Sequence, residues 1–392
     1  MDFDEDPWRS DPRGTLSELQ KSSSRLSNDF IEDDDEQNKN PFEFEQSHCP
    51  IPITGKRVQR QPSSDISNAQ SDRDDNDPLL ATILVDFHHN LGPIIEFCHP
   101  PNLIEDSEFS RLLPFLALPD GAHMTEEDFS YFHLKPPSDG KLGDSTIFGI
   151  SFNRQLKASD LIEKSSHVTR SIVQKAIVVL TKKPVFGPIR DKLGVITKAF
   201  FSQRNFNELQ LLVQFHQSLE HSLQGYTTET VLNSGTNLRE LVLKFKHKTL
   251  VLLKLLLLQK RILFFGYKPL SKHPLYPVER LCTFQYSLVS LIPNLLNFLS
   301  HAASPDLPPV FGNRPVTSLR TSDRESLLRY VGMPLDLFGK TAFFQPYMPL
   351  QQIDILSKPS TNSFLAGTTN AVFTQQKNIK LDVIVNVSRF YI

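Results

Sequence analysis

Two side chains in one short segment could carry acid/base chemistry. Asp120 and His123 could form the proton-transferring pair of a hydrolase, because a carboxylate can orient a histidine that moves protons. The segment Leu118-Pro119-Asp120-Gly121 also has the composition of a turn, in which proline fixes φ and glycine permits positive φ. No partner nucleophile is evident in the sequence. The turn is therefore the favoured interpretation, and a hydrolase is a remote alternative.

A second group of side chains could bind a metal ion, namely His88, His89, Cys98 and His99. These residues fall on an expected β-hairpin, and adjacent residues of a strand point to opposite faces of the sheet. At most two ligands would then converge, whereas a structural zinc ion needs four. We expect no metal, no cofactor and no catalytic residue, and the sequence leaves the partner-binding residues unassigned.

The sequence lacks several common catalytic and nucleotide-binding motifs. The chain contains no G-x-x-x-x-G-K-[ST], G-x-G-x-x-G, G-x-S-x-G or H-E-x-x-H, so these nucleotide-binding, serine-hydrolase and zinc-protease signatures are missing. Lysine and arginine are spread over several elements without interleaved aromatic residues. This distribution argues against a nucleic-acid partner.

The net charge of −2 conceals two oppositely charged parts. Residues 1–78 contain 19 acidic and 9 basic residues, including the run Glu32-Asp33-Asp34-Asp35-Glu36, while the remainder contains 25 acidic and 33 basic residues. The first part has too few apolar residues to offset the entropy of ordering. It predicts a disordered acidic tail, either a solubilising spacer or a segment that binds a basic partner or carries phosphates.

The elements that would position any site begin at residue 79. Short β-rich runs at 81–87 and 93–97, joined by turn residues at 90–93, predict a hairpin. Three more strands are expected at 129–134, 146–152 and 171–180, the last being ambiguous with helix, and amphipathic patterns predict helices at 189–201 and 206–223. Together they indicate an α+β lobe over 79–225.

A second, α/β lobe is expected over 226–378, after a break near 225–235. Helices are predicted at 238–259 and 278–299, a proline-rich loop at 304–315, and strands at 262–266, 342–344, 351–356 and 363–366. The apolar run at 262–266 is typical of a strand buried on both faces. Lysines interrupt the apolar stretch 241–265, so it predicts a helix buried in a soluble domain and wetted along one edge, with a membrane span as the alternative.

The start of the chain lacks a basic region followed by an apolar stretch, so no secretory signal is expected. Three widely spaced cysteines do not suggest a disulfide framework. Both features favour a cytosolic protein.

Several ordered sequence blocks between about 80 and 385 resemble one known family. FHHNLGPIIEF at 87–97, then Pro100-Pro101 and LPFLALPDGAH at 113–123, resemble the opening of the Avl-nine family of DENN proteins. FGIS at 148–151 and VQK at 173–175 follow in the family's order. The second half resembles the family's central block through GMPL at 332–335, PYM at 346–348, LQQ at 350–352, AGTTN at 366–370, Phe373 and QQK at 375–377.

This resemblance implies an α/β protein with a longin-like upstream lobe, a central DENN lobe and a helical downstream part. It implies late secretory and exocytic traffic between the Golgi or endosomes and the cell surface, with peripheral association with those membranes. The implied partner is a Rab-type small GTPase, bound between the lobes. Promotion of GDP release is a further expectation, and a non-catalytic trafficking adaptor is the alternative.

The chain stops at Ile392, where the family continues into helices. Residues 379–392 are therefore expected to be a truncated start of the downstream part. The identity of the GTPase, exchange activity and the oligomeric state stay open at the level of the sequence.

Overall fold

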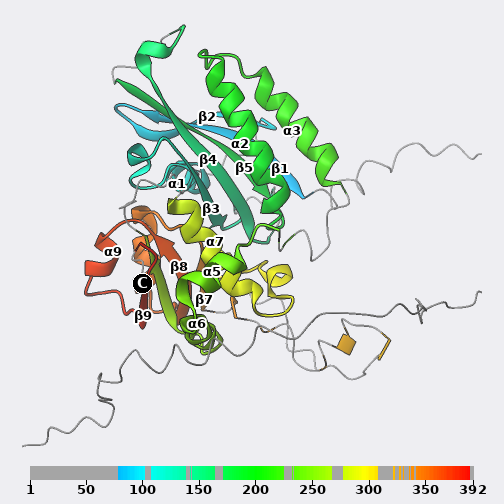
Figure 1. Cartoon of the computed structure of the whole chain (residues 1–392), viewed down its shortest axis with the longest axis vertical. Helices are drawn as coiled ribbons and strands as arrows, with labels where there is room; N and C mark the ends of the chain where they lie inside the picture. The colour runs from blue at the N-terminus through cyan, green and yellow to red at the C-terminus, as the bar shows by residue number, and fades with distance from the viewer. Residues whose placement is uncertain are drawn as a thin grey trace, which may run out of the picture. The chain divides into compact units, whose positions relative to one another are not determined.

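The computed structural model describes residues 78–101, 107–137, 142, 144–163, 171–224, 232, 234–266, 277–307 and 341–388, with scattered residues between 321 and 339. The acidic tail predicted over 1–78 lies outside these residues apart from Pro78, and so does most of the break predicted near 225–235. The described part has a mixed α/β fold with two sheets, which confirms the predicted class (Figure 1).

The first sheet contains five strands in the order β2-β1-β5-β4-β3, and all neighbouring strands are antiparallel. The strands are β1 (Leu79–His88), β2 (Gly92–His99), β3 (Glu127–Leu134), β4 (Ile147–Lys157) and β5 (Ile172–Thr181). All five predicted strands are confirmed, and the ambiguous one is a strand. Its β-branched run is buried completely from Ala176 to Leu180, between β1 and β4.

The predicted hairpin between β1 and β2 is also confirmed. Gly92 has φ +77° and pairs with His88, so the turn uses a left-handed conformation that glycine adopts without strain. The His88 Nδ1 atom accepts hydrogen bonds from the N–H groups of Asn90 and Leu91, each at 3.2 Å.

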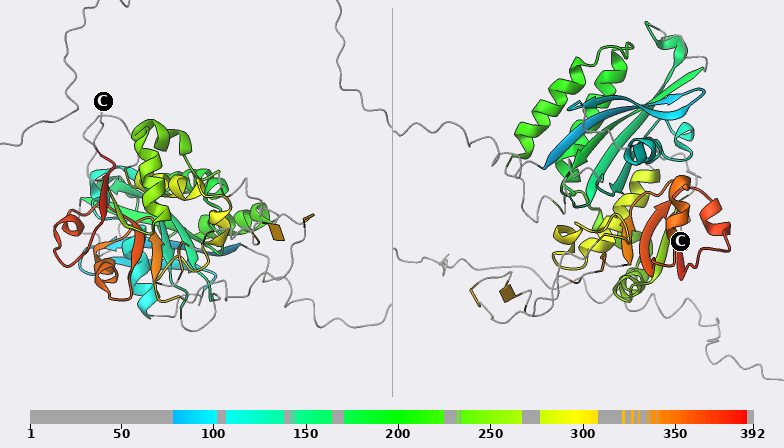
Figure 2. Two further views of the ribbon diagram at one scale, coloured as in Figure 1. Left: turned by 90° about the horizontal axis from the view of Figure 1, so that it is seen from below. Right: turned by 180° about the vertical axis from the view of Figure 1, so that it is seen from behind.

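Helices cover both faces of the first sheet (Figures 1 and 2). They are α1 (Ser107–Ala117), α2 (Phe186–Ser202) and α3 (Gln210–Leu223), and two short 3₁₀ helices occur at Ala122–Met124 and Ala158–Asp160. On one face, the hydroxyls of Ser130 and Ser151 donate to the last carbonyls of α1 at 3.1 and 3.0 Å. On the opposite face, the ring of Phe129 lies 4.7 Å below the guanidinium of Arg190 in α2. Because adjacent strand residues point to opposite faces, α1 and α2 flank the sheet.

Helix α1 is absent from the sequence-based prediction. Its apolar residues Phe109, Leu113, Leu116 and Ala117 recur at helical spacing and are buried. Pro114 lies inside this helix, and proline usually ends a helix. The proline therefore argues against a helix in the sequence, although the apolar spacing of residues 109–117 is helical.

The second sheet has four parallel strands in the order β7-β8-β6-β9. They are β6 (Arg261–Phe265), β7 (Ala342–Gln345), β8 (Ser363–Thr368) and β9 (Val383–Asn386), and α9 (Val372–Gln375) follows β8. Ile262, Leu263 and Phe264 are fully buried, as predicted for a strand covered on both faces. Helix α7 (Pro277–Ser290) packs against β6 and β8 of this sheet and against β3 of the first.

The prediction of a single helix over 238–259 is wrong. The chain forms α5 (Leu238–Phe245) and α6 (Lys248–Leu257), separated at Lys246, which has φ +51°. The ring of Phe245, the last residue of α5, packs against Phe264 and Phe284. The exposed edge of α6 is less polar than expected, because it carries Leu250, which is 70% exposed, as well as Lys254.

Two further predictions need correction. Residues 351–356 form a 3₁₀ helix (Leu350–Ser357) rather than a strand, since Ile353 and Leu356, three residues apart, both pack on the core. The helix predicted at 278–299 ends at Ser290 and is followed by a 3₁₀ helix at Leu295–Phe298. No helix among the described residues combines the length and hydropathy needed to cross a bilayer.

Candidate functional site

The turn that contains Asp120 joins the two sheets. The N–H of Asp120 donates to the hydroxyl of Tyr347 at 2.6 Å, and Thr369 Oγ1 donates to the carbonyl of Asp120 at 2.9 Å. Its carboxylate accepts a hydrogen bond from Asn370 Nδ2 at 3.0 Å. The N–H of Ala122 bonds the carbonyl of Pro119 at 2.9 Å, which confirms the predicted turn. Asp120 therefore links the end of β8 to the first sheet.

His123 occupies a different environment from Asp120. It lies exposed in the 3₁₀ helix Ala122–Met124, and its carbonyl accepts a hydrogen bond from Gln155 Nε2 at 3.3 Å. Among the hydrogen bonds described for Asp120, none reaches His123. The geometry gives Asp120 a linking role between the sheets.

The four candidate metal ligands of the hairpin also occupy separate environments. Cys98 Sγ donates to the carbonyl of Pro100 at 3.3 Å, and burial raises the pKa of its thiol to about 11, which disfavours the thiolate that binds metals. The ring of His99 packs edge-on against His216 at 4.8 Å. No group of three or more His, Cys, Asp or Glu side chains able to hold a metal occurs within the described residues.

A buried carboxylate on β3 caps the first turn of α7. Asp128 Oδ2 accepts a hydrogen bond from the N–H of Val278 at 3.0 Å, and Oδ1 accepts from Glu279 at 3.2 Å and from Phe129 at 2.8 Å. Burial raises the pKa of Asp128 to about 8, although its backbone hydrogen bonds act in the opposite direction. Asp128 therefore satisfies helix N–H groups that would otherwise be buried without partners.

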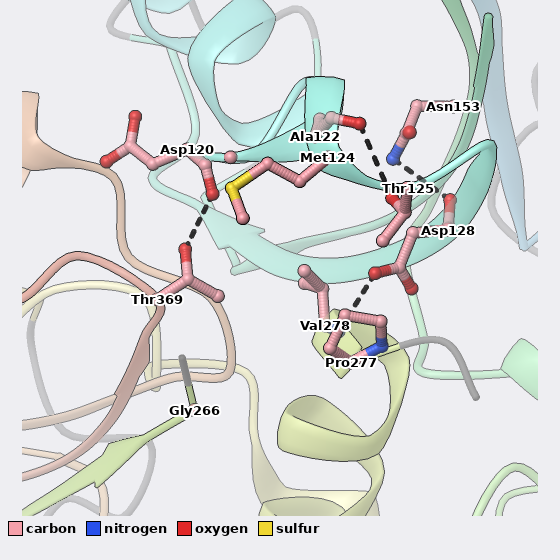
Figure 3. Close-up of a pocket in the computed structure, with 11 residues that line it drawn as sticks. Asp120, Ala122, Met124, Thr125, Asp128, Asn153, Gly266, Pro277, Val278 and Thr369 are labelled. Atoms are coloured by element: carbon pink, nitrogen blue, oxygen red, sulfur yellow. Dashed lines mark hydrogen bonds between the residues drawn. The ribbon is translucent and has the colours of Figure 1, made fainter. Parts of the chain in front are cut away.

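A small cavity of about 40 Å³ lies between the Asp120 turn, Asp128 and the start of α7 (Figure 3). Asn153 lines it, donates through Nδ2 to the backbone carbonyl of Asp128 at 3.0 Å, and has a buried Oδ1 with no hydrogen-bond partner among the described residues. This volume suits water rather than a metabolite, which needs several hundred Å³. The cavity is therefore too small to be a substrate pocket.

His133 forms a second, fully buried connection between the sheets. Its Nδ1 donates to the carbonyl of Phe344 at 2.6 Å, so its Nε2 accepts from the hydroxyl of Tyr286. The side chain of Gln345 pairs with the backbone N–H and carbonyl of His133 at 2.7 and 2.9 Å. Burial lowers the pKa of His133 to about 3, so the ring is neutral at physiological pH.

A larger groove opens at the same junction, between α2, the turn at 234–237, α5 and α7. We call this space, of about 360 Å³, the junction groove. Two ion pairs lie along it. The guanidinium of Arg190 bonds both carboxylate oxygens of Glu279, which raises the pKa of Arg190, and Arg280 Nε lies 2.7 Å from Glu240. The remaining lining residues are Tyr131, Ser234, Gly235, Thr236, Asn237 and Thr283.

The junction groove is polar and its charged side chains are partly accessible. The Arg190 side chain is 35% exposed and the Glu240 side chain 30%. Such groups can exchange an internal partner for a charged residue of another protein. The family resemblance implies a partner surface between the lobes, but the sequence does not identify its residues. No sequence pattern pairs Arg190 with Glu279, since 89 residues separate them.

The comparisons with known proteins give a consistent assignment. Residues 79–392 match the model of a family described as "Transport protein Avl9". The late secretory pathway protein avl9 of Schizosaccharomyces pombe is 43% identical over 308 residues, which is 78% of this chain and 62% of that protein. The late secretory pathway protein AVL9 of Saccharomyces cerevisiae is 38% identical over 332 residues, covering 79% of this chain and 42% of that protein.

The chain therefore matches less than two thirds of the length of either relative. The family match nevertheless includes every strand of both sheets. The chain belongs to the Avl9 family, as its sequence blocks had indicated.

Proposed function

We propose that this chain acts in membrane traffic of the late secretory pathway, between the Golgi or endosomes and the cell surface. The two curated relatives carry this pathway in their names, and they cover 78% and 79% of this chain. In this proposal the protein is cytoplasmic and associates peripherally with secretory membranes.

The proposed partner is a Rab-type small GTPase that docks at the junction groove. The observation that carries this assignment is the groove itself, an open space bounded by four elements and bearing the pairs Arg190–Glu279 and Arg280–Glu240. Protein–protein docking sites often place arginine where it can bind a carboxylate of the partner. The resemblance to DENN modules supports a GTPase as that partner.

Nucleotide exchange at such a surface requires no covalent step. A GTPase holds GDP through Mg²⁺, a phosphate-binding loop and ordered switch segments. A partner that binds the rearranged, nucleotide-poor state more tightly than the GDP-bound state lowers the barrier to release. The rigid connections through Asp120, Asp128 and His133 would hold the two sides of the groove in the geometry that this selection requires.

The test measures binding of the chain to a panel of Rab-type GTPases and release of fluorescent GDP from each. Thr283→Arg would place a long side chain in the junction groove, whereas Val195→Arg adds the same side chain at an exposed position of α2 outside it. We expect Thr283→Arg to abolish binding and Val195→Arg to preserve it.

The same measurements separate exchange from adaptor function. Binding that accelerates GDP release would support an exchange factor, and binding with unchanged release rates would assign the chain to an adaptor role. Equal binding by Thr283→Arg and the unaltered chain would remove the groove as the docking site.

A further inference from the structure

Helices α5 and α6 expose an unusual number of aliphatic side chains. Leu243 is 64% exposed, Val251 51% and Leu258 55%, in addition to Leu250. The opposite side of α6 is also apolar and is buried through Leu252 and Leu256. An apolar helix face normally lies against protein or lipid, so the aliphatic residues on the exposed side of α6 favour an apolar environment.

The exposed residues of α6 form one continuous stripe. Leu250, Val251, Lys254, Leu257 and Leu258 follow one another at intervals of one, three, three and one residues, which places them on a single face of a helix. The stripe therefore has aliphatic residues at both ends and a lysine in the middle. Leu243 and Lys246, at the end of α5, are exposed as well.

The charges around this stripe have a single sign. Residues 241–260 include Lys244, Lys246, Lys248, Lys254 and Lys260 and contain no aspartate or glutamate. Glu240, the acidic residue of α5, lies 2.7 Å from Arg280 in the junction groove. The charged side chains of these twenty residues are therefore all basic.

We propose that this region binds directly to the surface of an anionic lipid bilayer. The α5–α6 surface consists of Leu243, Lys246, Leu250, Val251, Lys254 and Leu258. An amphipathic element with aliphatic residues and lysines lies in the membrane interface, with its apolar groups at the acyl boundary and its ammonium groups among anionic headgroups. The aliphatic stripe and the single sign of charge both match this ligand.

The position of α6 in the fold suits this geometry. Helix α6 lies at the end of the second sheet that faces away from the five-stranded sheet, as both views show (Figures 1 and 2). Its buried side packs on α7 and α5, so the exposed side can meet a flat surface without rearrangement of the core. This assignment does not depend on the junction groove or on a GTPase.

Flotation of the full chain with lipid vesicles tests the proposal. We expect binding to vesicles that contain phosphatidylserine, weak binding to pure phosphatidylcholine, and a decrease with rising ionic strength. Lys246→Gln and Lys254→Gln should each weaken binding about fivefold, because each removes one lysine from the membrane surface. The pair Leu250→Gln and Val251→Gln should weaken it by at least about tenfold, since two aliphatic groups are lost.

Matched controls lie on α2. Val195 is 71% exposed and Lys192 is exposed on the same helix, so Val195→Gln and Lys192→Gln repeat the chemical changes away from the α5–α6 surface. These controls should bind vesicles as the unaltered chain does. Glutamine favours helix, and circular dichroism with a thermal melt would establish that each variant is folded.

Two results would overturn the proposal. One is equal vesicle binding by the Leu250→Gln, Val251→Gln variant and its controls. The other is an oligomer in the absence of lipid that this variant disperses while vesicle binding is unchanged, which would make a second copy the occupant. Thr283→Arg should retain vesicle binding, so failure of the GTPase proposal is distinguishable from failure of this one.

Discussion

The carboxylate of Asp128 lies 3.0 Å from the backbone nitrogen of Val278, so a strand of the first sheet caps a helix that also packs on the second. Helix α7 begins with Pro277, which has no N–H, and its next two N–H groups both bond Asp128. A single buried side chain therefore determines where α7 begins and holds it against β3.

Removing this cap should destabilise the whole described fold. Asp128→Ala leaves the buried N–H groups of Val278 and Glu279 without acceptors, and we expect a loss of about 2–4 kcal/mol in the free energy of unfolding. Asp128→Asn keeps one oxygen acceptor and should lose less. Urea denaturation followed by circular dichroism measures both. Asp354→Ala, at an exposed position, is the control and should stay within about 0.5 kcal/mol of the unaltered chain.

The same carboxyl group should make stability depend on pH. Burial raises the pKa of Asp128 to about 8, whereas the ordinary value is 3.8. Between these values the folded state keeps a proton that the unfolded state releases, so the free energy of unfolding should fall as pH rises and level off above about 8. His133, with its pKa lowered from 6.5 to about 3, contributes the opposite slope, which ends near pH 6.5.

Urea denaturation between pH 6.5 and 8.5 isolates the contribution of Asp128. The unaltered chain should lose stability more steeply over this range than Asp128→Asn, which cannot titrate. Parallel curves for the two proteins would mean that Asp128 is already ionised in the folded state at neutral pH.

The sequence predicted the strands well because their signals are local. The apolar run at 261–265 indicates a buried strand regardless of what packs on it, whereas the β-branched run at 172–181 was compatible with helix, and its position between β1 and β4 decides for strand. Helix boundaries failed where distant contacts decide them. The position of Phe245 between Phe264 and Phe284 fixes the end of α5. The strand predicted at 351–356 failed as well, because these residues follow the three-residue period of a 3₁₀ helix.

The candidate site was less accessible to sequence reasoning. Asp120 was recognised as a turn residue, but its bond to Asn370 joins positions 250 residues apart. Asp128 and Val278 are separated by 150 residues, and no periodicity in either strand or helix connects them. Polar contacts of this kind depend on the packing of the two sheets, which composition and spacing do not specify.

Gly367 lies where the chain leaves no room for a side chain. A Cβ atom at Gly367 would overlap Gln285 Nε2 and the carbonyl of Pro346, which bond each other at 2.8 Å. Gly367→Ala should therefore lower the free energy of unfolding by about 1–3 kcal/mol through overpacking, and by more if that hydrogen bond breaks. A thermal melt measures the effect. Gly266→Ala is the control, since its nearest neighbour would lie at 3.5 Å, and equal melting temperatures for the two variants would contradict the prediction.

Lys175 should be the most sensitive charged residue of the first sheet. Its side chain is 4% exposed, and its ammonium group lies 2.9 Å from Asp86 and 2.5 Å from Glu96. Lys175→Met leaves two carboxylates close together without a cation, and a loss of about 3–5 kcal/mol is expected because the Asp86 charge is buried. Urea denaturation measures it.

An exposed ion pair supplies the comparison for Lys175. Lys198 is 50% exposed and lies 2.9 Å from Glu127, so Lys198→Met should change stability by only about 0–1 kcal/mol. Neutralising all three groups with Lys175→Met, Asp86→Asn and Glu96→Gln should recover much of the lost stability, since no uncompensated charge then remains buried. Similar losses for Lys175→Met and Lys198→Met would mean that water reaches the Lys175 cluster and screens it.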